Sequence, residues 1–501
     1  MGSEPNAPGA PSHPLRSRDG AILAALGLAG ALVPWVLWGL FDVPVIGGAD
    51  PGMWEEAALG ITRWEASPVA PIYPLLLVAA VWATGAAWDV AGMAIAIACC
   101  AALPPATWLL LRRLGVARSA ATTGALLAVG EPWLALGSLQ AQPDTLTALV
   151  IVLTMLAALA WVATPKWPQF AALLLAMGLV SEVREHAPVV TAGLLLLLAA
   201  APGGIAKRAG RSMLAVIALA FVPTLLGEVM VLPWQQHWVV LRWGALFRDI
   251  GGSAAPSFLS DTPPDYRRAF AGAYAAHDRL GLAWLHLRMN VYHGWTPWAW
   301  LAAGAVGWLL LGKRRRVVWI GFLPVGAVLG GAQQPRHVAV LVPLAAACWV
   351  AGALRIRRWG RFLAPGVPLA LVVAGILAPG HAPLDQRMRC GHRAEIKAAA
   401  TRVCAAVGPD AVAVGGNPRP QVYCVLPKLG LREAAALDVP LVWFGDLPEG
   451  GSKKRDTLMA DGWEKLDVGD DHFPVWVRPA RARTVPAGDQ DAGPDGPSAP
   501  R

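Results

Sequence analysis

Long runs of apolar residues alternate with short polar or basic segments over most of the chain. Such runs, free or nearly free of charge, cover residues 21–41, 69–88, 90–111, 119–138, 145–164, 167–181, 187–206, 212–232, 294–312, 317–335, 338–354 and 362–380. About 20 apolar residues in a helix cross the hydrocarbon core of a bilayer. The pattern therefore predicts a polytopic α-helical membrane protein.

Four basic clusters give the predicted helices an orientation. They are Arg112/Arg113/Arg118, Lys207/Arg208/Arg211, Lys313–Arg316 and Arg355/Arg357/Arg358/Arg361. Even numbers of apolar runs separate successive clusters, so all four lie on one face. The positive-inside rule makes that face cytoplasmic.

Run 69–88 decides whether the N-terminus agrees with this orientation. Arg16 and Arg18 precede the first run, and they lie on the face of the clusters only if 69–88 does not cross. Two prolines and a glycine within this run disfavour a regular spanning helix. We therefore expect about eleven spans, an N-terminus inside and an interfacial or re-entrant helix over 69–88. A spanning helix over 69–88 is the alternative.

The polar segments divide the chain into four parts. We expect a disordered tail over 1–18, a transmembrane domain over 19–380 with outer loops 42–68 and 233–293, a soluble extracytoplasmic α/β domain over 381–479, and a disordered tail over 480–501. In the soluble domain, the spacing of apolar residues predicts a helix over 395–407 and short strands at 411–414, 441–444 and 475–477. Its cysteines, Cys390, Cys404 and Cys424, allow one disulfide outside the cytoplasm.

Composition agrees with a membrane protein and excludes a soluble one. Only 15% of residues are charged and 55% are hydrophobic, whereas soluble proteins carry about 25% charged residues. The formal charge of +9 resides in the short clusters between the runs, so no nucleic-acid partner is expected. The 24 tryptophans suit helix ends among lipid headgroups. The expected location is the cytoplasmic (inner) membrane, with membrane lipids as partners.

Three carboxylates stand at or near the ends of predicted helices. Asp50 follows the first run, Asp144 precedes run 145–164, and Glu131 lies inside 119–138. Asp50 and Asp144 can each be read as a helix N-cap, and an acid inside an apolar run is by default paired or functional. In the eleven-span topology both aspartates reach the outer face, where two carboxylates can act as base and positioning group.

Two turns on the outer face carry basic residues. Arg184, Glu185 and His186 join two runs, and Arg336-His337 precede run 338–354. Arginine binds phosphate oxygens in a bidentate manner. Together with the two acids, these residues indicate a phosphorylated, anionic ligand at the membrane surface. Ordinary solvated charge is the alternative for each residue taken alone.

The order of these motifs resembles the GT-C superfamily of integral-membrane glycosyltransferases, near the branch of protein O-mannosyltransferases and aminoarabinose transferases. The resemblance covers most of residues 20–380. Four elements carry it: Gly48-Ala49-Asp50-Pro51-Gly52-Met53-Trp54…Ala57, Pro132…Ser138…Asp144-Thr145-Leu146, Arg184, and Arg336-His337…Pro343. The fold that it implies is GT-C-like, with a soluble domain on the outer face.

The resemblance implies transfer of a sugar from a polyprenyl-phosphate donor to a lipid, glycan or protein acceptor at the outer face. By this resemblance, Asp50 matches the general base, and Asp144 matches a second acid that positions a substrate. Arg184 and Arg336 match the groups that hold the lipid phosphate. The other candidates for substrate binding are Glu55, Glu56, Glu131, His186 and His337. Because Glu55 and Glu56 make their stretch unusually acidic, the choice of base among Asp50, Glu55 and Glu56 stays open.

No metal site is predicted. The metal-dependent oligosaccharyltransferase members of the superfamily carry two acids one residue apart at the second site, and Gln142 replaces the first of them here. Glu185 and His186 still offer ligands for a divalent cation. The donor is a substrate, and no other cofactor is expected.

Two other classes of protein compete with a transferase. A transporter or flippase for a lipid-linked glycan would place ionisable residues near mid-membrane and show inverted repeats. Most acids here lie at run ends, and no repeat is visible. A non-catalytic scaffold with a cell-wall-binding outer domain would leave the acids and arginines without a purpose.

Overall fold

The computed structural model describes most of the apolar runs and part of the C-terminal region. It covers residues 17–41, 49–62, 70–183, 294–311, 338–377, 393–416, 437–444, 462–467 and 475–480, except 139, 165 and 357, with isolated positions between 210 and 288 and at 426 and 434. The chain divides into two compact units, Met1–Ile396 and Lys397–Arg501. The described part is mostly helical, with one small sheet.

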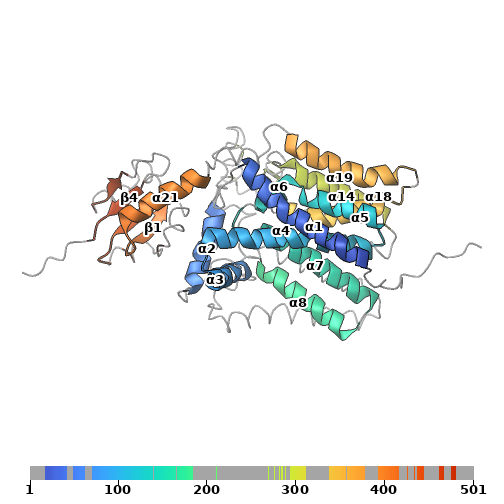
Figure 1. Cartoon of the computed structure of the whole chain (residues 1–501), viewed down its shortest axis with the longest axis horizontal. Coiled ribbons are helices and arrows are strands. Elements are labelled where there is room, and N and C mark those ends of the chain that lie inside the picture. Colours follow the sequence, from blue (N-terminus) through green and yellow to red (C-terminus); the bar gives the residue numbers. More distant parts are fainter. Residues whose placement is uncertain are drawn as a thin grey trace, which may run out of the picture. The chain divides into compact units, whose positions relative to one another are not determined.

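The first unit is a bundle of helices (Figure 1). They are α1 (Ser17–Phe41), α2 (Ala49–Thr62), α3 (Ile72–Thr84), α4 (Trp88–Arg113), α5 (Arg118–Val129), α6 (Pro132–Gly137), α7 (Asp144–Ala163), α8 (Trp167–Val183), α14 (Trp295–Leu310), α18 (Val342–Ala353) and α19 (Gly360–Leu377). Every predicted apolar run that the structure describes contains a helix. Runs 187–206, 212–232 and 317–335 lie outside the described residues.

Run 119–138 differs from the prediction of a single span. It forms two helices, α5 and α6, which are separated at Gly130 and Glu131. Pro132 begins α6, and a proline at that position has no N–H with which to continue the hydrogen bonds of α5. The prediction of one uninterrupted helix is therefore wrong.

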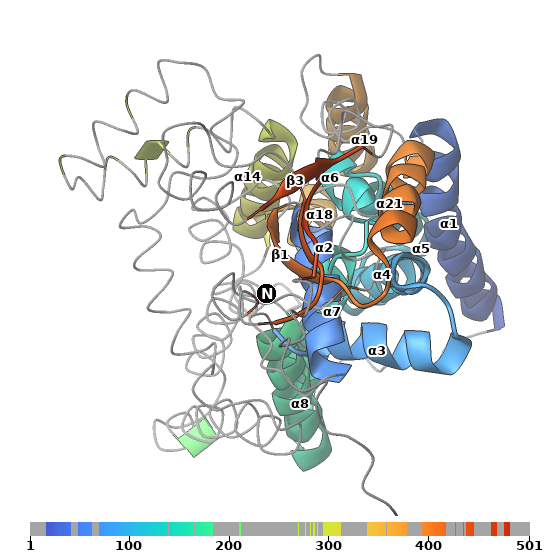
Figure 2. The same ribbon diagram turned by 90° about the vertical axis from the view of Figure 1, so that its left-hand side faces the viewer.

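Run 69–88 contains a separate short helix. α3 has 13 residues, which corresponds to about 20 Å, whereas a bilayer core is about 30 Å thick. Gly85 ends α3 with a φ of 66°, a left-handed conformation that favours glycine. α2 and α3 lie at the end of the bundle where α1 ends and α4 begins, and α3 runs across that end (Figures 1 and 2).

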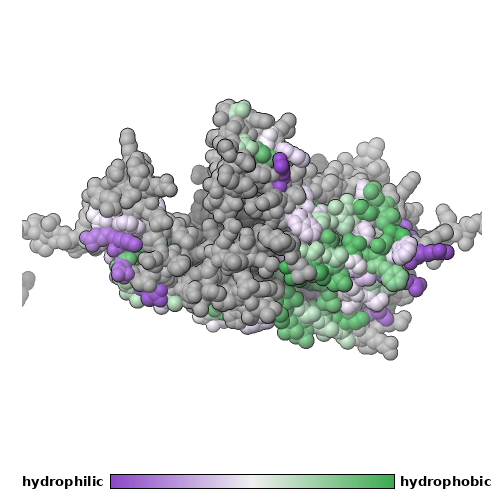
Figure 3. Space-filling model, turned by 90° about the horizontal axis from the view of Figure 1, so that it is seen from above, coloured by the Kyte–Doolittle hydropathy of each residue, from purple (hydrophilic) through white to green (hydrophobic). Residues whose placement is uncertain are grey.

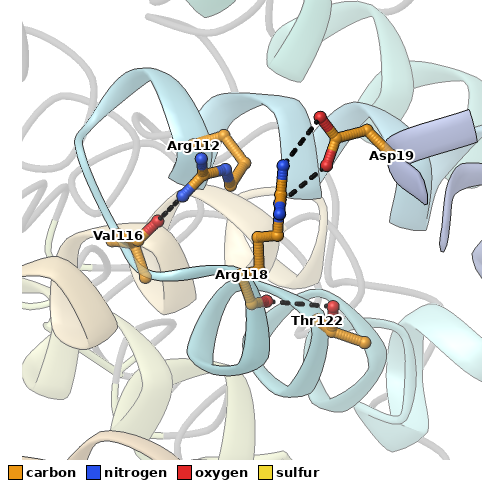
Figure 4. Close-up of polar contacts among 5 residues, drawn as sticks. All are labelled: Asp19, Arg112, Val116, Arg118 and Thr122. Carbon is orange, nitrogen blue, oxygen red and sulfur yellow. Dashed lines mark hydrogen bonds and ion pairs between the residues drawn. The ribbon is translucent and has the colours of Figure 1, made fainter. Parts of the chain in front are cut away.

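An ion pair at the opposite end shows how often the chain crosses the bundle. Arg118 Nε lies 2.8 Å from Asp19 Oδ1, and the same guanidinium donates to Asp19 Oδ2 at 3.3 Å (Figure 4). The starts of α1 and α5 are therefore together, so the chain goes out along α1 and returns along α4. α3 adds no crossing. Arg112, which donates to the carbonyl of Val116 at 2.6 Å, lies at this end too.

The bundle presents apolar side chains on its outside. Helices Trp88–Arg113 and Asp144–Trp161 are long and apolar enough to cross a membrane, and five shorter described helices are also apolar. Leu28, Leu175 and Phe362 are 63%, 65% and 72% exposed. Figure 3 shows such side chains as a green surface over the described helices. Exposed apolar faces of this kind suit lipid surroundings.

Glycines allow the closest helix contacts of the bundle. A Cβ on Gly352 of α18 would overlap the backbone of Gly307 of α14, and a Cβ on Gly30 of α1 would overlap the carbonyl of Cys100 of α4. Small residues let helix backbones approach in membrane proteins, where dispersion contacts replace the hydrophobic effect. These positions therefore fix α14 against α18 and α1 against α4.

The second unit contains a four-stranded sheet. Its strands are β1 (Val412–Gly416), β2 (Leu441–Phe444), β3 (Glu464–Leu466) and β4 (Val475–Arg478), in the order β1-β2-β4-β3. β1 and β2 are parallel, and the other pairs are antiparallel. α21 (Arg393–Val407) packs Val403 and Val407 against one face of the sheet. The predicted helix and three predicted strands are found, and β3 is additional. The boundary near 381 stays a prediction.

One of the predicted disulfide candidates is bonded. Cys404 of α21 forms a disulfide whose partner lies outside the described residues, whereas Cys99, Cys100 and Cys348 of the bundle are free and buried. Cys390 and Cys424 are themselves outside the description.

Candidate functional site

The first two turns of α4 are the common support of the site. Asp89 and Gly92 are three residues apart and lie on one face of this helix. A Cβ on Gly92 would overlap Ala141 Cβ and would lie 3.4 Å from Leu77 Cδ2 of α3. Glycine at position 92 thus allows α3 and the turn before α7 to rest on the same end of α4.

A buried cluster of titratable side chains includes Asp89. Glu55 of α2 and Tyr73 of α3 are fully buried, and Asp89 is 2% exposed. Trp54, next to Glu55, packs edge-on against the ring of Tyr73, with 5.7 Å between centroids. Among the described residues, neither carboxylate oxygen of Glu55 nor the hydroxyl of Tyr73 has a hydrogen-bond partner.

The pKa values of Glu55 and Tyr73 in this cluster are raised. Burial, and then the charge of Asp89, raise the pKa of Glu55 well above its ordinary value of 4.5. Burial, and then Glu55 and Cys99, raise the pKa of the Tyr73 phenol well above 10.0. Burial thus favours the protonated form of both groups.

Asp50 is the second residue of α2. Its backbone is described, and its side chain is not. Asp50 and Glu55 are five residues apart, which separates them by about 7.5 Å along the helix axis and by about 140° around it. The two acids therefore lie on different faces of α2. Because Glu55 is fully buried and its pKa is raised, it is a poor candidate for the base, and Asp50 and Glu56 remain.

Asp144 is the first residue of α7 and is 1% exposed. Pro143 occupies the cap position and accepts a hydrogen bond from the N–H of Thr147 at 2.7 Å. The alternative that Asp144 is the N-cap is therefore not realised. A carboxylate in the first turn is stabilised by the helix dipole. A Cβ on Gly137 would lie 3.6 Å from Asp144 Oδ2, so α6 closes one side of this carboxylate.

Glu131 forms a link within the bundle. Its Oε2 accepts a hydrogen bond from the N–H of Leu134 at 2.8 Å, and its Oε1 accepts one from the hydroxyl of Thr296 at 2.9 Å. Glu131 thus caps α6 and joins it to the start of α14, and Gly375 of α19 packs against Pro132 and Thr296. Both carboxylate oxygens are occupied, which favours a structural role over the predicted substrate binding.

The predicted cationic residues fall outside the description. Arg184, His186, Arg336 and His337 are not described, and neither is the side chain of Glu56. That these side chains lie close to Asp50 and Asp144 stays a prediction. Within the described ranges, no group of three or more His, Cys, Asp and Glu side chains could hold a metal ion.

Sequence reasoning missed Asp89, Tyr73 and Thr145. Thr145, next to Asp144, is 1% exposed, and its hydroxyl has no partner within the described residues. Asp89 stands between two apolar runs, as Asp144 does, and this position is the signal that could have found it. Tyr73 gives no such signal, because an aromatic residue in an apolar run is usually a core residue.

Comparison with solved structures finds several similar chains. ArnT from Cupriavidus metallidurans in the apo state has a TM-score of 0.48 and 16% identity, covering 92% of this chain and 98% of that one. The same protein bound to undecaprenyl phosphate has a TM-score of 0.47 and 15% identity, covering 90% of this chain and 97% of that one. The oligosaccharyltransferase of Archaeoglobus fulgidus in the apo form has a TM-score of 0.48 and 12% identity, covering 85% of this chain and 69% of that one.

Both proteins are members of the GT-C superfamily, which the sequence of this chain resembles. No protein-family model matches the chain, and no curated protein matches it.

Proposed function

We propose that this protein is a GT-C-type glycosyltransferase of the cytoplasmic membrane. It moves a sugar from a polyprenyl-phosphate donor to an acceptor at the outer face. The single observation that carries the proposal is the arrangement around α4. In its first turns, the charge of Asp89 acts on Glu55 of α2, and Gly92 packs against Leu77 of α3 and against Ala141, which precedes Asp144.

The proposed chemistry follows from these positions. Asp50, at the start of α2, takes the proton of the acceptor group as that group attacks the anomeric carbon of the sugar. The bond between this carbon and the polyprenyl phosphate breaks, and the lipid phosphate leaves with the electron pair. Arg184 and Arg336 compensate its charge. Asp144 orients a substrate, and no step requires a metal ion.

The proposed topology places α1, α4, α5, α7 and α8 across the membrane and α3 at its outer surface. α3 carries no charged residue. Trp82, which is 88% exposed, anchors its outward face among the lipid headgroups. The end of the bundle with Asp19, Arg112 and Arg118 is cytoplasmic. The Cys404 disulfide supports an extracytoplasmic C-terminal domain, since disulfides persist in oxidising compartments.

Cysteine labelling tests this topology. Ala83→Cys on α3 and Ser119→Cys on α5 place exposed thiols at opposite ends of the bundle, and the bundle's own cysteines are buried. An impermeant maleimide is expected to label Ala83→Cys in intact cells and Ser119→Cys only after permeabilisation. The reverse pattern would contradict the orientation, and equal labelling of both in intact cells would contradict the topology.

The function is tested by the lipids of a strain that lacks the protein. We expect a polyprenyl-phosphate sugar to accumulate and a glycan, lipid or protein modification to disappear. Purified protein incubated with the accumulated lipid should release polyprenyl phosphate in the presence of acceptor. A lipid profile identical to that of the parent strain, with no turnover by the purified protein, would refute the proposal.

A further inference from the structure

The turn between α18 and α19 gathers positive charge that the proposed chemistry does not use. This α18–α19 turn, residues 354–362, contains four arginines, and the chain has no Asp or Glu between Asp278 and Asp385. The arginines that the structure describes are exposed, namely Arg355, Arg358 and Arg361. The turn therefore presents a cluster of cations that no carboxylate nearby in the sequence neutralises.

Two large aromatic side chains lie among these arginines and are also exposed. Trp359 is 66% exposed and Phe362 is 72% exposed. Phe362 begins a stripe of exposed apolar residues along α19, which continues with Leu369, Val373 and Ile376. At 3.6 residues per turn, these four residues lie within about 60° of one another around the helix. Such a stripe suits the acyl chains of lipids, so the α18–α19 turn stands where a lipid-facing surface ends.

Close contacts between the two helices hold the backbone of the turn in one shape. A Cβ on Gly360 would lie 2.5 Å from the carbonyl oxygen of Ala353, so glycine allows α19 to begin against the end of α18. The indole N–H of Trp349 in α18 donates to the carbonyl of Leu363 in α19 at 3.0 Å. Within the turn, the N–H of Gly360 donates to the carbonyl of Ile356 at 2.9 Å. The backbone that carries the arginines is therefore preorganised, which lowers the cost of binding a ligand.

Packing against α5 shows at which end of the bundle the α18–α19 turn lies. A Cβ on Gly124, in the middle of α5, would lie 3.1 Å from Val350, near the end of α18. A Cβ on Gly130, just after α5, would lie 3.4 Å from Val372, in the second half of α19. α19 thus runs beside α5 in the same direction (Figure 1). The turn therefore lies at the end where α5 begins, which is the end of the ion pair in Figure 4.

We propose that the α18–α19 turn binds the headgroups of anionic phospholipids in the leaflet at this end of the bundle. Guanidinium groups donate paired hydrogen bonds to phosphate oxygens, and indole rings favour the headgroup interface. Trp359 and Phe362 then lie where the headgroups meet the acyl chains, and the arginines reach the phosphates. The inference goes beyond the proposed function, because it depends on the position of the bundle in the membrane and not on sugar transfer.

Binding of lipids to the full-length protein in neutral detergent tests this inference. The anionic probe is phosphatidylglycerol, the zwitterionic probe is phosphatidylcholine, and native mass spectrometry counts the bound lipids. We expect phosphatidylglycerol to bind more tightly and its affinity to fall as salt is added, because salt screens exposed charges. A basic residue near an anionic surface strengthens binding roughly fivefold, so Arg355→Gln combined with Arg358→Gln should weaken it roughly 25-fold.

The matched control is Arg113→Gln combined with Lys166→Gln, which removes the same charge from two other exposed positions of the bundle. It should weaken the binding of phosphatidylglycerol much less. Equal losses in the two double variants would mean a diffuse attraction and would overturn the inference, as would equal affinity of the wild type for the two lipids. If the first double variant does not fold, Arg358→Gln alone decides, with an expected loss of roughly fivefold.

Two further measurements separate a lipid headgroup from other ligands. Trp359→Ala should weaken the binding of phosphatidylglycerol and leave its salt dependence unchanged, because the indole contributes contact area and no charge; an unchanged affinity contradicts the placement of the headgroup at this turn. Inorganic phosphate should not displace the lipid, and full displacement would assign the turn to a free anion. All these measurements use protein without donor or acceptor, so failure of sugar transfer leaves their result unaffected.

Discussion

Asp50→Asn is expected to lower the rate of sugar transfer by about 10² to 10⁴-fold, the usual contribution of a general base. Asparagine keeps the size and polarity of the side chain but cannot accept the acceptor's proton. Because Asp50 is the second residue of α2 and an Asn near a helix start is well tolerated, the amount of folded protein should not change. Release of polyprenyl phosphate from a labelled donor measures the rate.

The matched control is Glu56→Gln, which removes a neighbouring carboxylate from the same helix. It should reduce transfer only slightly. If Glu56→Gln abolishes turnover and Asp50→Asn does not, the base is Glu56. If neither variant loses activity, the start of α2 does not supply the base.

Gly307→Val is expected to prevent stable folding of the bundle. A Cβ at this position would lie 2.5 Å from the Cα of Trp349 and even closer to the backbone of Cys348, so α14 and α18 could not keep their distance. Overpacking of a well-packed core usually costs about 1–3 kcal/mol. The clash here is with backbone atoms, which cannot rotate away, so we expect at least the upper value. Thermal unfolding in detergent and gel filtration measure the loss.

Gly366→Val in α19 is the control for this variant. It also lies inside an apolar helix, but a Cβ there would meet nothing within 4 Å. The control carries the same change in helix propensity without the clash, so it should lower the melting temperature much less. Equal effects of the two variants would mean that valine in a helix, and not the contact between α14 and α18, causes the loss.

The sequence predicted the helices and strands where the pattern is local. Apolar runs, prolines and glycines mark α1, α4, α7 and the short α3. The prediction of one span over 119–138 is wrong, because Pro132 interrupts the helix although the run is hydrophobic throughout. The sequence pointed to the candidate acids Asp50 and Asp144 because each lies within the first two residues of a helix, and their role stays a prediction.

The sequence by itself determined which segments are apolar, which helix ends carry acids and which turns carry basic clusters, since these properties depend on residues close together in the chain. Only the tertiary structure decided that the starts of α1 and α5 lie together, because the Asp19–Arg118 ion pair joins residues from two different helices. In the same way it paired Glu131 with Thr296 and placed Glu55 beside Asp89. Such contacts join distant segments, and they follow from the packing of helices around glycines such as Gly92 rather than from any periodicity in the sequence.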